Sequence, residues 1–194
     1  MTKTFVWLFV LELLLAPAAI AQQFTPWEIY GGYSLERSGV RQYYKSTPII
    51  YTFREQYINL RGWEVSVNEN ANSWVGGTLQ LNGHYRTENA LGTRNHQSDF
   101  SILYGPRLFH RIAWITPFAH ALFGATHESV TSPGPHASET EFAFAGGAGL
   151  DLNLSNNVGF RVFQVQYSPK NVIAAKPNKY QASAGVVVYL GKRK

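Results

Sequence analysis

The chain has 194 residues, a formal net charge of +5 and no cysteine. Its charged residues make up only 15% of the sequence, against about 25% in an ordinary soluble domain. The absence of cysteine excludes a disulfide scaffold, a cysteine-ligated metal site and a thiol nucleophile. A mean hydropathy of −0.18 argues against a bundle of membrane helices, and an aromatic content of 14% argues against disorder.

The first 21 residues have the pattern of a secretory signal peptide. Lys3 gives a positively charged start, Phe5–Leu15 is almost entirely apolar, and Ala19–Ala21 has the form of a cleavage site. The apolar run is shorter than the roughly 20 residues that a spanning helix needs. We therefore predict a cleaved signal peptide over residues 1–21, one folded domain over residues 22–190 and a short basic tail over residues 191–194.

After the signal peptide, apolar and polar residues alternate with a period of two in segments of about ten residues. In Trp74–Tyr85, for example, Leu79 and Leu81 lie on one face, and Gln80 and Asn82 lie on the other. Eight segments are predicted strands: Trp27–Leu35, Gly62–Asn68, Trp74–Tyr85, Asp99–Phe109, Trp114–Thr126, Glu141–Leu152, Val158–Tyr167 and Tyr180–Leu190.

The predicted connections alternate between short and long. The short ones are Asn70–Ser73, His110–Ala113 and Asn153–Asn156, and the long ones are Glu36–Glu55, Thr87–His96, His127–Glu139 and Ser168–Asn178. In an up-and-down arrangement, this alternation places all the long loops at one end of the strands. Both ends of the folded domain then lie at the other end.

Two features interrupt the strand pattern. The alternation in Val158–Tyr167 slips before Gln164, and a β-bulge near Val162–Phe163 would restore it. Pro106 and Pro117 are equally far from the predicted His110–Ala113 turn, so a simple hairpin register predicts that they face each other.

Alternation alone does not decide whether the apolar face points inward, as in a soluble lipocalin-like carrier, or outward to lipid. The polar face carries charges that would be costly to bury in a soluble core. It also carries many small residues, which a narrow lumen needs. We predict a lumen charge network of Glu64, Asp99, Arg107, Asp151 and Arg161.

Tryptophan and tyrosine concentrate at the strand ends, as in the aromatic girdles at the two bilayer interfaces. The predicted interfacial aromatics are Trp27, Tyr33, Trp74, Tyr85, Trp114, Tyr167 and Tyr180. The combined pattern predicts a closed antiparallel eight-stranded up-and-down transmembrane β-barrel.

The sequence resembles the eight-stranded outer-membrane β-barrel domain family typified by outer membrane protein A. The resemblance covers most of the predicted domain, and the stretches that carry it include WEIYGGY (27–33), LYGPR (103–107), TPFAHALFG (116–124), FAGGAGLD (144–151) and SAGVVVYL (183–190). It implies the outer membrane of a Gram-negative-type envelope, with the lipid bilayer, lipopolysaccharide and the outer-membrane assembly machinery as partners. Leu190 stands where such domains usually have a terminal aromatic.

His127, Ser129 and Glu141 form one catalytic hypothesis. A histidine, a serine and an acid are the base, nucleophile and orienting group of acyl transfer. They resemble the His-x-Ser and later Glu of the lipid A deacylases, which are also eight-stranded outer-membrane barrels. Val130, however, follows the serine where those enzymes have Asn. We predict no enzymatic activity and keep a lipid A-modifying acyl hydrolase as an alternative.

The remaining side chains predict no cofactor, and the histidines lack the i, i+2 or i, i+4 spacing of a metal pair. The basic residues are scattered, which argues against nucleic-acid binding.

The loop Glu36–Glu55 is basic and aromatic, which favours contact with anionic lipopolysaccharide or another surface. We predict an integral outer-membrane protein with a structural or surface-interaction role. A narrow solute or ion pore is a further alternative, although paired lumen charges favour a static plug.

Overall fold

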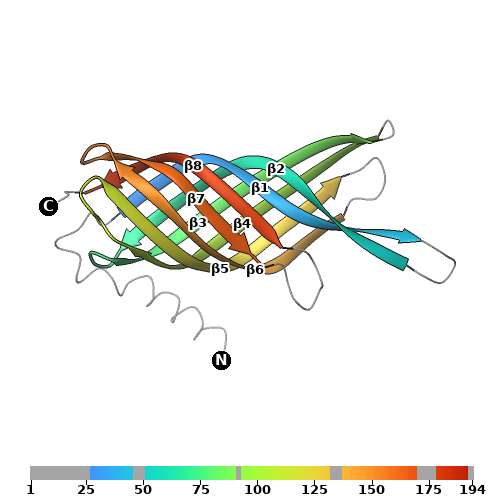
Figure 1. The fold of residues 1–194 in the computed structure, drawn as a ribbon, viewed down its shortest axis with the longest axis horizontal. Helices are drawn as coiled ribbons and strands as arrows, with labels where there is room; N and C mark the ends of the chain where they lie inside the picture. Colours follow the sequence, from blue (N-terminus) through green and yellow to red (C-terminus); the bar gives the residue numbers. More distant parts are fainter. Residues whose placement is uncertain (1–26, 46–50, 91–92, 132–136, 170–177, 192–194) are drawn as a thin grey trace, which may run out of the picture.

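The computed structural model describes residues 27–45, 51–90, 93–131, 137–169 and 178–191. These residues form one closed antiparallel barrel in which each strand pairs with the next and β8 pairs with β1 (Figure 1). The strands are β1 (Trp27–Lys45), β2 (Tyr51–Asn70), β3 (Val75–Ala90), β4 (Thr93–Phe109), β5 (Ile115–Thr131), β6 (Ala137–Asn153), β7 (Val158–Ser168) and β8 (Lys179–Leu190). The predicted fold class is confirmed.

The signal peptide predicted over residues 1–21 and most of the predicted basic tail lie outside the described residues. No helix in the described part of the chain is long and apolar enough to cross a bilayer.

Several strands are longer than the alternation predicted. Pairing between β1 and β2 continues out to Lys45↔Tyr51, and pairing between β3 and β4 continues to Ala90↔Thr93. Pairing between β5 and β6 likewise continues to Val130↔Ala137. The predicted long loops Glu36–Glu55, Thr87–His96 and His127–Glu139 are therefore mostly paired strand, and those three predictions were wrong. Where a hairpin extends beyond the barrel wall, neither of its faces contacts lipid or the lumen, so its sequence needs no alternation of apolar and polar residues. Its backbone groups still form the hydrogen bonds of a paired strand.

The short turns lie at the end of the barrel where β1 begins and β8 ends, as predicted (Figure 1). The extended hairpins project from the opposite end. We call the first the turn end and the second the mouth end.

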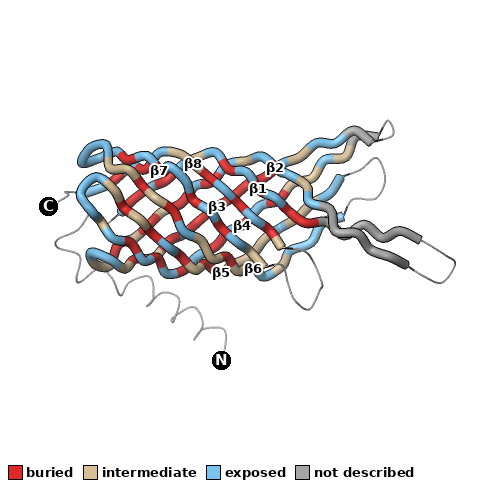
Figure 2. Tube along the Cα trace, in the orientation of Figure 1, coloured by how far each residue is buried: buried red, intermediate tan, exposed pale blue. Residues whose placement is uncertain are grey.

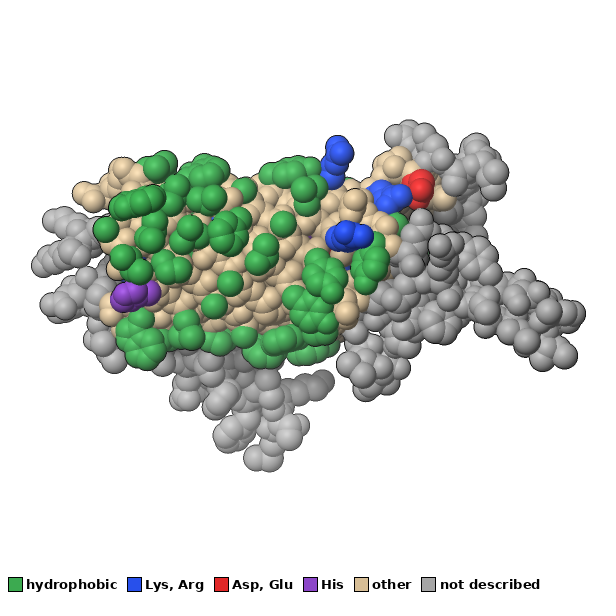
Figure 3. Space-filling view, viewed as in Figure 1, with side chains coloured by type: hydrophobic (Ala, Val, Ile, Leu, Met, Phe, Trp, Pro, Cys, Tyr) green, Lys and Arg blue, Asp and Glu red, His purple; other side chains and the backbone are tan. Residues whose placement is uncertain are grey.

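The apolar face of each strand points outward. Ile102 and Phe123 are 48% and 46% exposed on the outer wall, whereas Gln80 and Arg161 are buried inside. Buried and exposed residues alternate along the strands (Figure 2), and hydrophobic side chains cover much of the visible wall (Figure 3). The alternative of a soluble carrier with an apolar interior was therefore wrong.

The predicted bulge in β7 is confirmed. Leu150 pairs with Phe163, whereas Asp151 pairs with Arg161, so Val162 is the extra residue. Val162 and Phe163 both lie exposed on the outer wall, and the inward phase resumes at the next residue, the buried Gln164.

The predicted pairing of Pro106 with Pro117 was wrong. The β4–β5 turn is closed by the Ile112↔Ile115 bridge, later in the chain than expected. This shift moves the β4–β5 register, so that Arg107 pairs with His120 and the carbonyl of Pro117 accepts a hydrogen bond from the backbone N–H of His110. The turn needs Ala113 in the left-handed region, at a φ of 49°.

Glycines in β6 make room for large side chains inside the narrow barrel. A Cβ at Gly149 would lie 2.5 Å from the Phe118 ring, and one at Gly147 would lie 2.6 Å from Nε2 of His120. The small residues of the polar face thus accommodate the bulky lumen side chains of β5.

Candidate functional site

The lumen near the turn end holds a dense ion-pair network, which we call the turn-end cluster. Its members are Glu28, Arg107, Arg111, Asp151 and Arg161. Glu28 accepts hydrogen bonds from Arg107 and Arg111, both at 2.6 Å. Asp151 accepts two from Arg161, at 2.7 and 3.1 Å, and one from Arg107 at 3.3 Å. Such paired, hydrogen-bonded charges are the form in which ions are tolerated in a protein interior.

Aromatic rings hold the guanidinium groups of this cluster in place. The Arg161 guanidinium carbon lies 4.1 Å from the centroid of the Tyr30 ring and 4.3 Å from that of Phe118. Arg107 lies over the same Phe118 ring at 4.6 Å. Stacking of this kind stabilises a desolvated cation, so the cluster fills the lumen with fixed side chains.

Amide side chains continue the network toward the mouth end. Glu64 accepts hydrogen bonds from Gln164 at 2.7 Å and from Gln181 at 2.8 Å. The Gln164 carbonyl in turn accepts a hydrogen bond from Arg161 at 2.6 Å. These contacts connect the middle of the lumen directly to the turn-end cluster.

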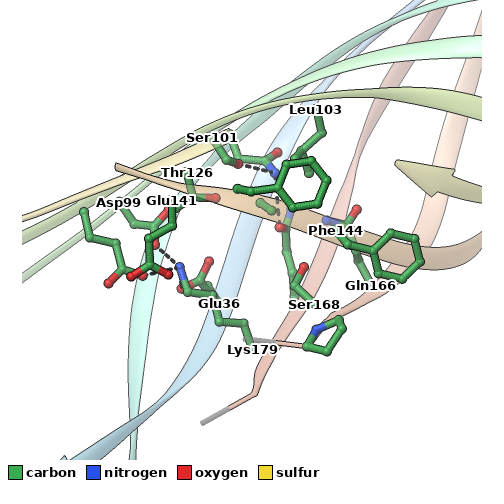
Figure 4. A pocket seen from close by; sticks show the side chains of 16 residues that line it. Glu36, Asp99, Ser101, Leu103, Thr126, Glu141, Phe144, Gln166, Ser168 and Lys179 are labelled. Carbon is green, nitrogen blue, oxygen red and sulfur yellow. Dashed lines mark hydrogen bonds and ion pairs between the residues drawn. The ribbon is translucent and has the colours of Figure 1, made fainter. Parts of the chain in front are cut away.

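A second charged group lies at the mouth end, and we call it the mouth cluster. It comprises Glu36, His84, Asp99, Glu128 and Lys179, which come from five different strands. Lys179 forms ion pairs with Asp99, with Glu128 at 2.8 Å and with Glu36 at 3.6 Å. In Figure 4 the Lys179 side chain reaches in among these acidic groups.

All five residues of the predicted lumen network are buried, but Asp99 belongs to a different cluster from the other four. Arg107, Asp151 and Arg161 belong to the turn-end cluster, Glu64 is held by glutamines, and Asp99 belongs to the mouth cluster. The prediction missed Glu28, Arg111, Glu36 and Lys179. Strand phase could have found Glu28, which is inward together with Tyr30, whereas Glu36 and Lys179 lay just outside the predicted strand segments.

The catalytic candidates lie on two faces of the sheet. His127 pairs with Thr140 across β5 and β6, and Ser129 pairs with Ser138, which puts these two side chains on the same face. Glu141 instead pairs with Thr126, one position out of phase, and lines the lumen cavity beside Glu128. The Nδ1 atom of His127 is 2.7 Å from the Thr140 hydroxyl. The structure therefore does not bring the three residues together.

The predicted interfacial aromatics are all exposed on the outer wall. They are Trp27, Trp74 and Trp114 toward the turn end, and Tyr33, Tyr85, Tyr167 and Tyr180 toward the mouth end. Tyr167 and Tyr180 stack with ring centroids 5.4 Å apart. Two rings of amphipathic side chains at the two rims of an apolar wall are the arrangement expected at two bilayer interfaces.

Two arginines project outward at the level of the mouth-end aromatics. Arg61 lies directly opposite Tyr85, and Arg37 lies directly opposite Tyr180. Arg37 also lies over the Tyr57 ring, 5.0 Å from its centroid. Both arginines border a shallow depression of about 840 Å³ in the outer wall. In Figure 3, Lys and Arg side chains lie at the mouth-end edge of the hydrophobic surface. Arg37 was included in the predicted basic segment Glu36–Glu55, but sequence reasoning missed Arg61.

A closed barrel with an apolar outer wall, two aromatic rims and a polar lumen is a transmembrane β-barrel. The family model for the outer membrane protein beta-barrel domain matches residues 7–189. The chain belongs to this family and is a protein of the Gram-negative outer membrane.

Solved outer-membrane barrels share the fold at low sequence identity. Ail, the attachment invasion locus protein of Yersinia pestis, is 20% identical, with a TM-score of 0.57 over 84% of this chain and 96% of Ail. Neisserial surface protein A is 12% identical, with a TM-score of 0.63 over 85% and 97%. OprG of Pseudomonas aeruginosa is 10% identical, with a TM-score of 0.52 over 85% and 96%. No curated protein matches the chain significantly.

Proposed function

We propose that this protein is a non-conducting membrane anchor that presents an interaction surface outside the outer leaflet. One observation carries the proposal: the β1–β2 hairpin continues past the barrel wall. Pairing between β1 and β8 extends to Ser38↔Lys179, whereas pairing between β1 and β2 continues to Lys45↔Tyr51. A two-stranded ribbon that stands above the membrane is accessible to partners and is not needed to close the barrel.

The chemistry of the ribbon favours an anionic partner. Residues 40–56 include three basic residues, Arg41, Lys45 and Arg54, and one acidic residue, Glu55. This excess of positive charge attracts polyanions over distances of about a Debye length. Ail has been crystallised with the heparin analogue sucrose octasulfate. A phosphorylated or sulfated glycan is the partner class that we propose for this ribbon, with lipopolysaccharide as the nearest source.

The outward arginines support lipopolysaccharide as the first partner. Arg37 and Arg61 lie level with the tyrosines of the mouth-end rim, where the headgroup phosphates of the outer leaflet would lie. A guanidinium group binds phosphate through two parallel hydrogen bonds. We therefore propose that these arginines fix the height of the barrel by binding lipopolysaccharide phosphates.

The experiment compares binding of purified lipopolysaccharide to the folded chain and to the Arg37→Gln/Arg61→Gln variant. We expect the double variant to bind about tenfold more weakly, equivalent to roughly 1.4 kcal/mol. The matched control is Arg86→Gln, because Arg86 pairs with Glu88 at 3.0 Å. Equal affinities for the double variant and the control would contradict the role of the arginines.

The proposal also predicts the absence of an open pore. The turn-end cluster and the glutamines above it occupy the lumen with hydrogen-bonded side chains. A planar-bilayer recording of the folded chain should therefore show no discrete conductance. Steps of stable conductance at neutral pH would favour the pore alternative.

A further inference from the structure

The mouth cluster brings together three side chains of the kinds that bind metal ions, and each comes from a different strand. Glu36 of β1, His84 of β3 and Asp99 of β4 are all buried. One potential ligand atom from each lies within 4.8 Å of the other two. Two carboxylates and one imidazole are a ligand set that divalent transition metals accept.

The environment of His84 supports a metal site at this position. Its Nε2 atom lies 2.9 Å from the Ser34 hydroxyl, so the ring is held from behind. Its buried Nδ1 atom has no hydrogen-bond partner among the described residues and faces Glu36 Oε2 at 3.5 Å. When Nε2 donates its proton to the Ser34 oxygen, Nδ1 keeps its lone pair for a metal, and the serine acts as the orienting partner that metal-bound histidines usually have.

The separation of 3.5 Å between Nδ1 and Glu36 Oε2 also has the size expected for two ligands of one ion. Bonds of about 2.0–2.2 Å at a tetrahedral angle place two ligand atoms roughly 3.3–3.5 Å apart. The same separation is long for an N–H···O hydrogen bond. The two atoms are therefore spaced for a cation between them.

Lys179 shows that this acidic cluster already holds one cation. Its ammonium group forms ion pairs with the carboxylates of Glu36, Asp99 and Glu128. A metal ion at the same position would take over this role of the ammonium group.

A small cavity lies beside the two carboxylates of this set. Glu36, Asp99, Glu128 and Lys179 all line a cavity of about 40 Å³, which has room for a few water-sized particles. The side chains of Glu128 and Lys179 keep 24% and 10% of their surface exposed. Solvent therefore reaches the cavity at Glu128 and Lys179.

We propose that Glu36, His84 and Asp99 bind one divalent transition-metal ion of the Zn²⁺ type, and that Lys179 is the displaceable cation that occupies the cluster without metal. The nitrogen ligand favours Zn²⁺ over Ca²⁺ and Mg²⁺, which take oxygen ligands. Lys179 keeps Glu128 as its partner when the metal binds. This site lies inside the barrel and is independent of the proposed surface function.

The test is calorimetric titration of Zn²⁺ into the folded, chelator-treated full chain. We expect one Zn²⁺ per chain, with Ca²⁺ giving no competing binding. His84→Gln should weaken binding by about 100-fold, and Lys179→Met should tighten it by about tenfold. Ser34→Ala, which removes only the orienting partner, should weaken it by roughly 10- to 100-fold. Heat-modifiable gel mobility checks that each variant is folded.

His120→Gln is the matched control, because His120 is also buried in the lumen but contacts Gln166 at 3.2 Å instead of a carboxylate. Its Zn²⁺ affinity should equal that of the unmodified chain. A readout that needs no variant is the side-chain ¹⁵N spectrum, in which the His84 signals should move on addition of Zn²⁺ and those of His120 should not. Equal binding by His84→Gln and His120→Gln, or no Zn²⁺ binding even by Lys179→Met, would overturn the proposal.

Discussion

The two charged clusters of the lumen are built in opposite ways. The turn-end cluster has three arginines for two carboxylates, and its guanidinium groups stack on aromatic rings. The mouth cluster has three carboxylates for one lysine, and its cation reaches in alone. Arginine forms planar, paired contacts, whereas lysine is a point charge on a flexible stem. We therefore expect the turn end to be the more rigid of the two and the cation at the mouth end to exchange more readily.

The largest expected effect comes from breaking the turn-end cluster. Asp151→Ala removes the acceptor of three hydrogen bonds. It leaves the buried Arg161 without its carboxylate partner, whereas Arg107 keeps Glu28. We expect the free energy of unfolding to fall by roughly 3–5 kcal/mol, measured by urea unfolding in detergent micelles. Glu88→Ala, at the partly exposed pair with Arg86, should change it by about 0.5 kcal/mol or less. Similar losses for both variants would contradict a fixed turn end.

Steric crowding at the turn end can be tested without removing a charge. Gly149→Ala places a Cβ 2.5 Å from the Phe118 ring that supports Arg107 and Arg161. We expect a loss of about 1–3 kcal/mol from overpacking, read in the same unfolding assay. Gly146→Ala is the matched control on the same strand, because its Cβ would meet no atom within 4 Å. If both variants are equally stable, the lumen is less tightly packed than the structure indicates.

The mouth cluster should respond more weakly, and its response should depend on salt. Lys179→Met leaves three carboxylates without their shared ammonium partner. We expect a loss of about 1–2 kcal/mol, smaller than for Asp151→Ala because water and ions reach this end. Raising the ionic strength should recover part of it by screening the repulsion. A salt-independent loss, like that expected for Asp151→Ala, would remove the contrast between the two ends.

One turn at the fixed end is strained, and relieving it should add a small gain. Ala113 has a φ of 49°, a conformation that costs most side chains about 1–2 kcal/mol and costs glycine nothing. Ala113→Gly should therefore raise the free energy of unfolding by roughly 1 kcal/mol. Ala119→Gly, on the exposed face of β5, should instead lower it by about 0.5–1 kcal/mol. A loss in both variants would show that the turn relaxes in the membrane.

The smallest expected effect is on lipid A acylation, for which we expect no change. Ser129→Ala should leave the acyl pattern of lipid A unchanged in cells, because Glu141 lies on the opposite face of the sheet from His127 and Ser129. Mass spectrometry of extracted lipid A, with and without the expressed chain, measures this directly. A chain-dependent loss of an acyl group that disappears in Ser129→Ala would restore the hydrolase alternative.

Much of the barrel was predictable because period-two alternation is a local property. Each predicted strand lies within an observed strand, apart from Trp74 and Trp114 at the turns. Even the bulge at Val162 left a readable slip in the pattern. The lengths of the hairpins were not predictable in this way, because residues such as Arg41 and Arg54 pair through their backbones without an apolar face.

The sequence by itself determined the strands, the inward side chains and the aromatic rims, because these follow from the alternation of residue types along one segment. Only the tertiary structure decided which charges meet. Glu36, His84 and Asp99 are brought together by barrel closure and register, as are Glu28 and Arg107, which are 79 positions apart. The register of the β5–β6 hairpin pairs Glu141 with Thr126, on the face opposite Ser129. Strand register is a long-range property, so no spacing within a strand reveals these sites.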